Sequence, residues 1–507
     1  MTSKLGFALV LHAHLPYVRE CAPFGVVERW YHEALWECYL PLVAMLDAHA
    51  AAGLAAPFTL SVSPPLASML ADPVLARRFE DHVAALAELD RRLGVGGVYG
   101  TRLDIALARW ERCERRPLAR LAEHALEARI ELTTTSASHA FLPGLGHLDG
   151  GVVSQLRVGA ASFERLTGRA VSRGRWVPEC AVDERVTRAL ASAGVGHTVL
   201  DPRALGSRDP TFVEVAAPRV TPHGTAFFVR DRVTTNRVWS RRGGYPGHAV
   251  YREFHRDVGY ELAHERLGPF GAGAMTGLKY WAIGRSGAQQ PRYEPRVAEE
   301  RAAHDAEDFV AHLESLAAHE ARDGARDGER VVVAAFDAEL FGHWWFEGPT
   351  FLDHVLRRLA TSATVRPVTL SGCLAEQARL AQPTTLAHAE PRASSWGHEG
   401  AFAEWVGPRT ARVWRAVHGV RREIASRARS GRDVVAVANA AREMFLLEAS
   451  DWPYLLATGS MTEFAAARLK QHAERALAWL SRRPPPERTD FLRELDDAWL
   501  VEAIASS

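Results

Sequence analysis

The segment Val331-Val332-Val333-Ala334-Ala335-Phe336-Asp337 says most about the fold of this chain, because six apolar residues in a row end at a carboxylate. A strand with one face in water alternates apolar and polar residues, whereas a continuously apolar strand is covered on both faces, as in parallel sheets. Burying the charge of Asp337 beside such a strand is costly unless the carboxylate has a partner or a role. The segment therefore predicts a buried parallel strand that ends at a chemically important aspartate.

Other short apolar segments recur between stretches of helical periodicity, at residues 7–11, 58–62, 130–134, 175–178, 197–200 and 226–229. A helix is expected, for example, at residues 184–193, with Gly194 after its end. Alternating strands and helices are typical of parallel βαβ units. Seven or eight such strands favour an α/β fold with a closed (β/α) barrel over an open doubly wound sheet, and no glycine-rich nucleotide-binding turn follows any of them.

The chain is expected to have two domains, a barrel at residues 1–385 and an α-helical domain at residues 386–507. The boundary is placed at residues 383–395, which are rich in Pro, Thr, Ser and Ala. Beyond it the sequence has helical spacing and, at Ser460-Met461-Thr462-Glu463, the pattern of a capping box. Within the barrel, residues 232–272 break the alternation and predict a long surface loop, which is often a lid.

Composition narrows the class of protein. The 507 residues are 47% hydrophobic and 24% charged, which is typical of a globular chain. Because 61 basic side chains balance 61 acidic ones, no net field attracts nucleic acid or an anionic membrane. The five cysteines form no C-x-x-C pair, the apolar run at residues 5–11 is too short for a secretory signal, and no run approaches the roughly 18 apolar residues of a membrane span. We therefore expect a cytoplasmic protein without a nucleic-acid or membrane partner.

Three polar clusters follow predicted strands, at the end of a barrel where active sites are built. His12 and His14 lie two apart on a strand and so point to the same side, where they can bind a metal, bind a sugar hydroxyl or satisfy each other in a polar core. Glu179 follows the stiff Trp176-Val177-Pro178 and is an ion-pair partner or a nucleophile. Asp337 is a buried ion-pair partner or a carboxyl whose raised pKa lets it donate a proton near neutral pH.

Aromatic residues favour the catalytic interpretation of these clusters. The chain has 14 tryptophans, and many of them stand in or beside the polar clusters, as in Trp344-Trp345 after Asp337. Aromatic rings stack on the C–H faces of sugars, and an uncharged polymer as substrate agrees with the zero net charge. Two carboxylates with an aromatic cleft are typical of a glycosidase or a transglycosidase.

Five sequence blocks, taken together and in this order, resemble glycoside hydrolase family 57 and, most closely, its α-1,4-glucan branching enzymes, over nearly the whole chain. The blocks are His12-Ala13-His14-Leu15-Pro16-Tyr17, Leu132-Thr133-Thr134-Thr135-Ser136-Ala137-Ser138-His139, Trp176-Val177-Pro178-Glu179, the stretch from Phe336-Asp337 to Trp344-Trp345, and Ala449-Ser450-Asp451-Trp452-Pro453. The resemblance implies a (β/α)7 barrel, or incomplete TIM-like barrel, with a helical C-terminal domain and without a metal or other cofactor.

The resemblance also implies roles for individual residues. Glu179 is expected to be the nucleophile and Asp337 the general acid/base. The positions that match the subsite of the attacked glucose are His12, His14, His139, His343 and Asp451. The positions that match cleft aromatics are Trp30, Trp281, Trp405 and Trp452. The loop with Tyr245 resembles the mobile loop whose tyrosine covers the site in branching members.

The leading hypothesis is retaining transglycosylation, in which an α-1,4-linked chain is moved to a 6-hydroxyl of an amylose- or glycogen-like acceptor. Retention predicts roughly 5 to 5.5 Å between the two carboxyl groups. The protein is expected to be a monomer or a weak oligomer. Alternatives are an α-amylase or a 4-α-glucanotransferase on the same scaffold, a zinc hydrolase with His12, His14, His139 and Asp337 as ligands, and a catalytically silent glucan-binding protein.

Overall fold

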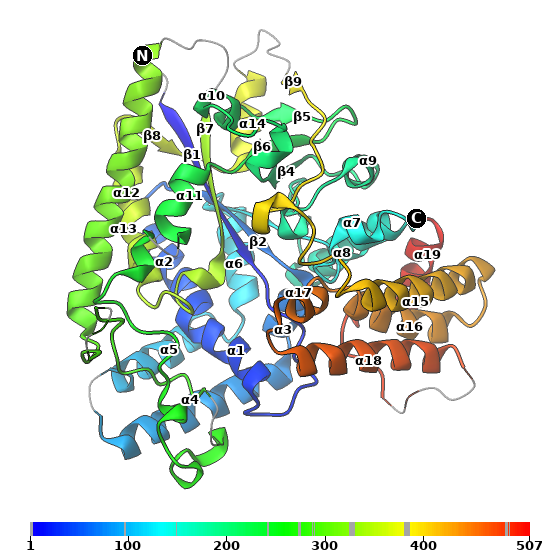
Figure 1. The fold of residues 1–507 in the computed structure, drawn as a ribbon, viewed down its shortest axis with the longest axis horizontal. Helices are drawn as coiled ribbons and strands as arrows, with labels where there is room; N and C mark the ends of the chain where they lie inside the picture. Colours follow the sequence, from blue (N-terminus) through cyan, green and yellow to red (C-terminus); the bar gives the residue numbers. More distant parts are fainter. Residues whose placement is uncertain are drawn as a thin grey trace.

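The computed structural model describes residues 4–507 except 96–97, 149, 241–242, 272–274, 286, 288, 324–329, 380–385, 482–484 and 486. The predicted apolar strand is β7 (Val331–Asp337), and it is buried up to its last residue. It pairs in parallel with β1 (Leu5–Ala13), and the register places Asp337 opposite His12. On its other side β1 pairs with β2 (Phe58–Val62), which pairs with β3 (Ile130–Thr133), again in parallel. Figure 1 shows β1 and β7 running side by side through the centre of the molecule.

A second sheet completes the ring of strands. It contains β4 (His197–Leu200) and β6 (Ala226–Val229) in parallel, with the short β5 (Arg219–Val220) and β9 (Ala387–His388) at its edge, while β8 (Val365–Pro367) pairs with the start of β1. Single parallel bridges join the two sheets, from Thr134 to Arg175, from Gly174 to His197 and from Arg230 to Val333. The predicted incomplete (β/α)7 barrel is thereby confirmed.

One predicted strand is wrong. Residues 175–178 form no strand, and only bridges at Gly174 and Arg175 hold this place in the ring. The reason is local, because Pro178 has no N–H to donate and the chain turns at once into the 3₁₀ turn Pro178–Cys180. The carboxylate of Glu179 is therefore carried by a turn above the ring.

The interior of the barrel explains where polar side chains emerge. Inside it, Val331, Val333 and Ala335 of β7 pack with Ala8 and Val10 of β1. Successive side chains of a strand alternate between its two faces, so the next inward positions are Asp337 on β7 and His12 on β1. The same rule that fills the core with apolar residues therefore delivers an aspartate and a histidine to the mouth of the barrel.

Helices surround the ring (Figure 1). They are α1 (Val26–Ala34), α2 (Leu40–Ala51), α3 (Pro64–Leu70), α4 (Pro73–Leu93), α5 (Gly100–Arg112), α6 (Pro117–Leu126), α7 (Leu142–Leu145), α8 (Gly151–Thr167), α9 (Glu184–Ser192), α10 (Phe212–Ala216), α11 (Arg232–Trp239), α12 (Pro295–Asp323), α13 (Gly348–Thr361) and α14 (Leu370–Arg379). The expected helix at 184–193 is confirmed as α9, which begins after its N-cap Asp183. The expected loop at 232–272 is corrected, because its first eight residues form α11 and the irregular segment extends to the start of α12.

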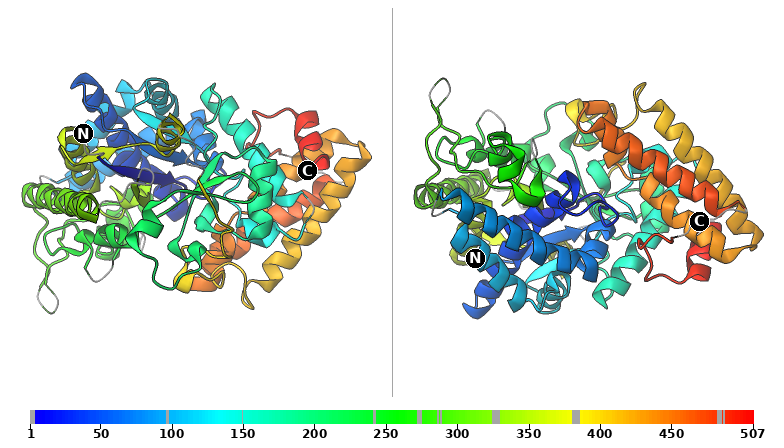
Figure 2. Two further views of the ribbon diagram at one scale, coloured as in Figure 1. Left: turned by 90° about the horizontal axis from the view of Figure 1, so that it is seen from above. Right: turned by 90° about the horizontal axis from the view of Figure 1, so that it is seen from below.

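The C-terminal part is helical, as expected. It consists of α15 (Ala411–Ser430), α16 (Val434–Leu447), α17 (Asp451–Thr458), α18 (Thr462–Trp479) and α19 (Asp497–Ala505), and Figure 2 shows these helices packed at one end of the molecule. The predicted capping box is wrong, because Met461 precedes α18 with a φ of 48° and no side chain caps its first turn. The domain boundary stays a prediction, and residues 383–385 of the expected linker lie outside the described residues. Among the described helices, none is long and apolar enough to cross a membrane.

Candidate active site

A line of hydrogen bonds crosses the mouth of the barrel from β2 to Glu179. His12 Nδ1 lies 3.4 Å from Ser61 Oγ, and His12 Nε2 lies 2.9 Å from His139 Nε2. His139 Nδ1 lies 2.8 Å from the hydroxyl of Ser450, and that hydroxyl donates to Glu179 Oε1 at 2.9 Å. Side chains from β1, from the loop after β3, from the C-terminal helical part and from the turn after Pro178 therefore form one connected group.

The direction of these bonds assigns the tautomers of both histidines. Because the Ser450 hydroxyl donates to a carboxylate, it accepts from His139 Nδ1–H, and His139 Nε2 then accepts from His12 Nε2–H. Desolvation by burial, followed by the charge of His14, lowers the pKa of both rings well below its usual value, which keeps them neutral. Neutral imidazoles with fixed donors and acceptors suit the binding of sugar hydroxyls.

Glu179 is held on a strained turn. Its φ is 63°, a left-handed conformation that is unusual for a residue other than glycine and costs about 1–3 kcal/mol. Its second carboxylate oxygen accepts from the indole N–H of Trp396 at 2.9 Å, and its side chain is 15% exposed. Burial raises its pKa, although the Trp396 and Ser450 donors act in the opposite direction by favouring the ionised form. The arrangement presents a partly exposed carboxylate in a fixed position, as a nucleophile requires.

Asp337 has the opposite electrostatic setting. Its pKa lies well above the usual value, first because of burial and then because of the negative charges of Glu339 and Glu179. No donor holds it in the charged form among the described residues. A carboxyl that keeps its proton near neutral pH can act as a general acid, and because the charge of Glu179 contributes to the raised pKa, we expect the two carboxyl groups to lie near each other. The separation of roughly 5 to 5.5 Å stays a prediction.

His14 and Asp451 extend this group on the side of α17. His14 Nε2 lies 3.2 Å from Asp451 Oδ2, and its Nδ1 lies 2.8 Å from the hydroxyl of Ser63. The His14 and His139 rings stack with centroids 3.8 Å apart and planes 16° apart. The structure therefore brings together His12, His14, His139, Glu179, Asp337 and Asp451 of the predicted site residues.

His343 lies elsewhere. Its ring is 5% exposed and contacts Glu37 on the π-helical turn Leu35–Tyr39, with Nδ1 3.1 Å from Glu37 Oε2. Among the described residues, its connection to the first group runs through the loop after β7, where its backbone N–H donates to the carbonyl of Glu339 at 3.1 Å. Its predicted role in the glucose subsite stays a prediction.

Two of the predicted cleft aromatics are core residues. Trp405 is 2% exposed and stacks on Phe141 at a centroid distance of 5.0 Å. Trp452 is 1% exposed, and its indole N–H donates to the carbonyl of Leu446 at 2.7 Å. Both rings are buried in this structure, and their role as cleft aromatics stays a prediction.

Trp30 and Trp281 are partly exposed, on α1 and in the irregular segment before α12. Two guanidinium groups, those of Arg256 and Arg292, lie 3.6 and 4.3 Å from the Trp281 ring centre, so a sugar would compete with them for that ring. Among the described residues, no ring contact joins Trp30 or Trp281 to the group around Glu179.

Tyr245 is held away from that group. Its hydroxyl donates to Asp308 Oδ2 on α12 at 2.5 Å, and its ring lies 5.7 Å from that of Phe351 on α13. In this arrangement the tyrosine is docked on the outer helices. A role as a lid requires these contacts to break.

Sequence reasoning missed three residues that shape the site. Trp396 and Ser450 both bond Glu179 although they lie 217 and 271 positions from it in the chain. Trp239, at the end of α11, is 38% exposed, with its ring 6.0 Å from that of Trp396 and 6.4 Å from that of Phe336. Ser450 stands beside Asp451 in a recognised block, which was the signal available for it. Nothing in the local pattern distinguishes Trp239 or Trp396 from the other tryptophans.

The zinc-site alternative does not fit this geometry. His12 and His139 already bond each other directly through Nε2 at 2.9 Å. Among the described residues, the group whose ligand atoms lie close enough for a metal is Glu33, Glu37 and His343, not the set with Asp337. A metal between the paired imidazoles would have to break the line of bonds that leads to Glu179.

Comparison with known proteins agrees with the site. The model of glycosyl hydrolase family 57 matches residues 8–383, about three quarters of the chain. The chain belongs to glycosyl hydrolase family 57. A second model, described as the C-terminal part of 1,4-alpha-glucan branching enzymes, matches residues 415–497.

Among family 57 relatives, a protein of Mycobacterium tuberculosis named as a probable 1,4-alpha-glucan branching enzyme is 30% identical over 97% of this chain and 95% of its own length. The 1,4-alpha-glucan branching enzyme TK1436 of Thermococcus kodakarensis is 29% identical over 92% of this chain and 71% of its own length.

Solved structures extend the likeness. The branching enzyme of Pyrococcus horikoshii superposes with a TM-score of 0.82 at 27% identity, covering 100% of this chain and 94% of the other. The α-amylase AmyC of Thermotoga maritima superposes with the same TM-score at 29% identity, covering 99% and 97%. One backbone therefore carries two named activities, and the choice between them lies in side chains and loops.

Proposed function

We propose that this protein is a 1,4-alpha-glucan branching enzyme that acts on an amylose- or glycogen-like glucan in the cytoplasm, as a monomer or a weak oligomer. The observation that carries the proposal is the pairing of Glu179, fixed by two donors, with Asp337, whose pKa is raised, at one mouth of a family 57 barrel. The curated relatives named as branching enzymes and the C-terminal match at residues 415–497 support branching over other activities of the family.

The first step forms a covalent intermediate. A Glu179 oxygen attacks C1 of a glucosyl residue while the bond from C1 to the neighbouring O4 breaks, and Asp337 gives its proton to the departing O4. The line of bonds through Ser450 and His139 keeps the attacking carboxylate in place. The neutral rings of His12 and His139 can exchange hydrogen bonds with sugar hydroxyls without adding charge to the site.

The second step forms the branch. Asp337, now ionised, takes the proton of an acceptor 6-hydroxyl, whose oxygen attacks C1 as the ester bond to Glu179 breaks. Water is the competing acceptor. Transfer wins over hydrolysis only where a glucan acceptor is held and water is excluded.

Incubation with amylose tests the proposal. A branching enzyme raises the proton NMR signal of α-1,6 linkages while the number of reducing ends stays constant, because each cleaved bond is replaced by another. The second candidate, an α-amylase, is favoured by the equal fit of the AmyC backbone, and it would raise the reducing ends without α-1,6 signal. That second outcome would replace the proposal.

Tyr245 offers a sharper test of transfer. If the loop leaves Asp308 and covers the site during turnover, Tyr245→Ala should raise the ratio of hydrolysis to branching. Tyr260→Ala is the matched control, because Tyr260 is 59% exposed in the same irregular segment. An equal ratio in both variants would remove Tyr245 from the account of branching.

A further inference from the structure

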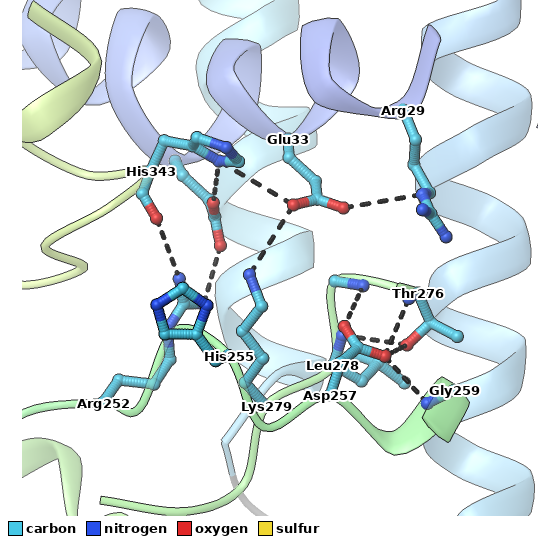
Figure 3. Close-up of polar contacts among 12 residues, drawn as sticks. Arg29, Glu33, Arg252, His255, Asp257, Gly259, Thr276, Leu278, Lys279 and His343 are labelled. Atoms are coloured by element: carbon cyan, nitrogen blue, oxygen red, sulfur yellow. Dashed lines mark hydrogen bonds and ion pairs between the residues drawn. The ribbon is translucent and has the colours of Figure 1, made fainter. Parts of the chain in front are cut away.

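A buried group of charges lies beside the loop that follows β7 (Figure 3). Glu33 and Glu37 come from the helix that runs through α1 and the π turn Leu35–Tyr39. Arg252 and Lys279 come from the irregular segment before α12, and His343 comes from the loop. The side chains of the two glutamates, the arginine and the lysine are 0–1% exposed. Charges held this far from water need partners, so their arrangement is informative.

The π turn is clamped onto the loop after β7. The thiol of Cys38 donates to the carbonyl of Ala338 at 3.0 Å, and the hydroxyl of Tyr39 donates to Glu339 Oε1 at 2.5 Å. Gly342 approaches so closely, with a φ of 129°, that a Cβ there would lie 2.0 Å from the carbonyl oxygen of Glu37. Single π turns in helices are frequent at functional sites. Because of this turn, residues 37–39 all contact the loop that begins at Asp337, the predicted general acid.

Glu37 is the centre of the group. Its Oε1 accepts from Arg252 Nη1 at 2.6 Å, and its Oε2 accepts from His343 Nδ1 at 3.1 Å. Burial acts to raise the pKa of Glu37, but the charge of Arg252 and then the bond to His343 outweigh it, and the pKa lies below the usual range. A full negative charge is thus kept inside the protein with one arginine and one histidine attached to it.

The anion fixes the histidine. A carboxylate only accepts, so the proton of a neutral His343 ring lies on Nδ1 and Nε2 is left as the acceptor available to a ligand. Arg252 steadies the same residue by reaching its backbone carbonyl at 3.4 Å. Within the described part of the chain, the polar contacts of the ring all run through Nδ1.

Arg252 and Lys279 are held as a unit. Between them in sequence, both oxygens of the Asp257 carboxylate accept bonds of 2.8 Å from the N–H groups of Gly259, Thr276 and Gly277, as Figure 3 shows for the first two. The backbone of Lys279 is tied to the hydroxyl of Tyr99, which donates to its carbonyl at 3.0 Å. Bonds within the segment and to Tyr99 therefore hold Arg252 and Lys279 in place where the segment meets the loop after β7.

A metal site is the obvious rival interpretation, because ligand atoms of Glu33, Glu37 and His343 all lie within 4.8 Å of one another. Two cations already serve these carboxylates, since Lys279 Nζ lies 3.7 Å from Glu33 Oε2 and Arg252 bonds Glu37. A third cation, Arg29, lies with its Nε 3.7 Å from Glu33 Oε1. A divalent ion would leave this buried group with excess positive charge and would displace the proton of His343 Nδ1.

We propose that Glu37 is a positioning residue for glucan processing. It holds His343 so that Nε2 is free for a sugar hydroxyl, and Arg252 couples the irregular segment to this function. The proposal rests on the proposed function. Through Arg252, the segment before α12 then influences the active site independently of Tyr245. Glu37 itself touches no substrate.

A double-mutant cycle tests the proposal on amylose cleavage. Glu37→Gln leaves one amide oxygen for two donors, and it should lower kcat/KM roughly tenfold or more, as loss of an outer partner of a binding histidine does elsewhere. His343→Asn keeps a donor toward Glu37 but removes Nε2, and it should lose as much while unfolding near the wild-type temperature. If Glu37 acts through His343, the double variant is no worse than His343→Asn. Fully additive losses would overturn the proposal.

The chain offers a matched control in Glu443 of α16. It is a buried carboxylate that bonds a histidine, His472, at 2.7 Å and an arginine, Arg475, at 2.7 Å, as Glu37 bonds His343 and Arg252. Glu443→Gln should leave kcat/KM within about twofold, since α16 lies outside the barrel. An equal loss of kcat/KM in Glu443→Gln and Glu37→Gln would mean that both act only through stability, and would overturn the proposal.

Two further results keep the proposals distinguishable. Wild-type protein without any action on α-glucans would refute the proposed function before the variants are compared, whereas an amylase in place of a branching enzyme leaves the cycle fully readable. Metal analysis of the purified protein should find no stoichiometric divalent ion. One bound equivalent whose removal by a chelator abolishes activity would overturn the positioning role and establish the metal site.

Discussion

The molecule has two groups of polar residues beside one active-site loop, one around three histidines and one around His343, and they are built in different ways. His12, His14 and His139 bond mostly neutral partners, namely hydroxyls and each other, and they lead to Glu179. His343 bonds a buried carboxylate that is itself bonded to an arginine. The first group is fixed by chemistry suited to a sugar, whereas the second is fixed by ions sealed away from solvent. Activity and stability should therefore respond differently to changes in the two groups.

The largest effect is expected in the first group. Glu179→Gln and Asp337→Asn should each lower glucan cleavage by about 10⁴-fold or more, as removal of a nucleophile or its proton donor does in other hydrolases. Both carboxyls have a raised pKa, so folding favours their protonated forms, and their stabilising effect is lost as pH rises past the usual carboxyl range. At pH 7 the amide variants should therefore unfold at the wild-type temperature or above it.

Activity and calorimetry on the same samples check this prediction. Retained branching in either variant would contradict the catalytic assignment. A large drop in unfolding temperature with lost activity would instead mean that these two residues act as buried groups that support the fold.

A change in the backbone that carries the second group should lower stability as well as activity. Gly342→Ala places a methyl group 2.0 Å from the carbonyl oxygen of Glu37 at a φ of 129°, so the loop must leave the π turn. We expect a loss of about 2–5 kcal/mol in the free energy of unfolding, from strain and overlap together, with lower activity because His343 moves. Gly53→Ala is the control, since Gly53 has a φ of 64° and nothing within 4 Å of the added carbon. A loss of the same size in both variants would show that backbone strain alone decides.

Glu339 joins the two groups, because its carboxylate accepts from the His14 N–H and from the Tyr39 hydroxyl. Its charge is the second cause, after burial, of the raised pKa of Asp337. Glu339→Gln removes that charge, so Asp337 should lose its proton at lower pH and the alkaline limb of the pH–activity profile should move to lower pH. The acid limb, set by ionisation of Glu179, should move less. An unchanged alkaline limb would mean that another group carries the proton.

The sequence was informative where structure is local and periodic. Alternation along β1 and β7 is enough to place His12 and Asp337 inward at the barrel mouth, because a two-residue period leaves no other side for them. Recognised blocks then supplied Glu179 and His139. Their left-handed backbone, with φ values of 63° and 57°, has no sequence signal, since glycine would be the usual residue there.

The sequence was uninformative where a side chain works from a distant segment. Trp396 and Trp405 stand nine positions apart in similar polar surroundings, yet one bonds the predicted nucleophile and the other is enclosed by helices. Only the packing of the C-terminal helices on the barrel separates them. For the same reason His343, which follows Asp337 by six residues, is turned toward Glu37 and not toward His12.

The smallest effect is expected at the rim, where Trp239 can sharpen the contrast between the groups. Its ring is 38% exposed and lies between Phe336, which precedes the general acid, and Trp396, which bonds the nucleophile. A sugar ring that stacks on Trp239 would lie beside the residues that hold the general acid and the nucleophile. Trp239→Ala should raise KM for amylose so that kcat/KM falls about fivefold, near 1 kcal/mol, with little change in kcat.

Trp499 on α19 provides the control, because its ring is also 38% exposed and stands in the C-terminal helical part. Trp499→Ala should leave KM unchanged. If both variants bind amylose equally well, exposed tryptophans contribute nothing specific and the cleft must be lined by other residues. If Trp239→Ala lowers kcat and leaves KM unchanged, the Trp239 ring acts through Trp396 on the nucleophile. Trp239 would then be a positioning residue, as Glu37 is proposed to be.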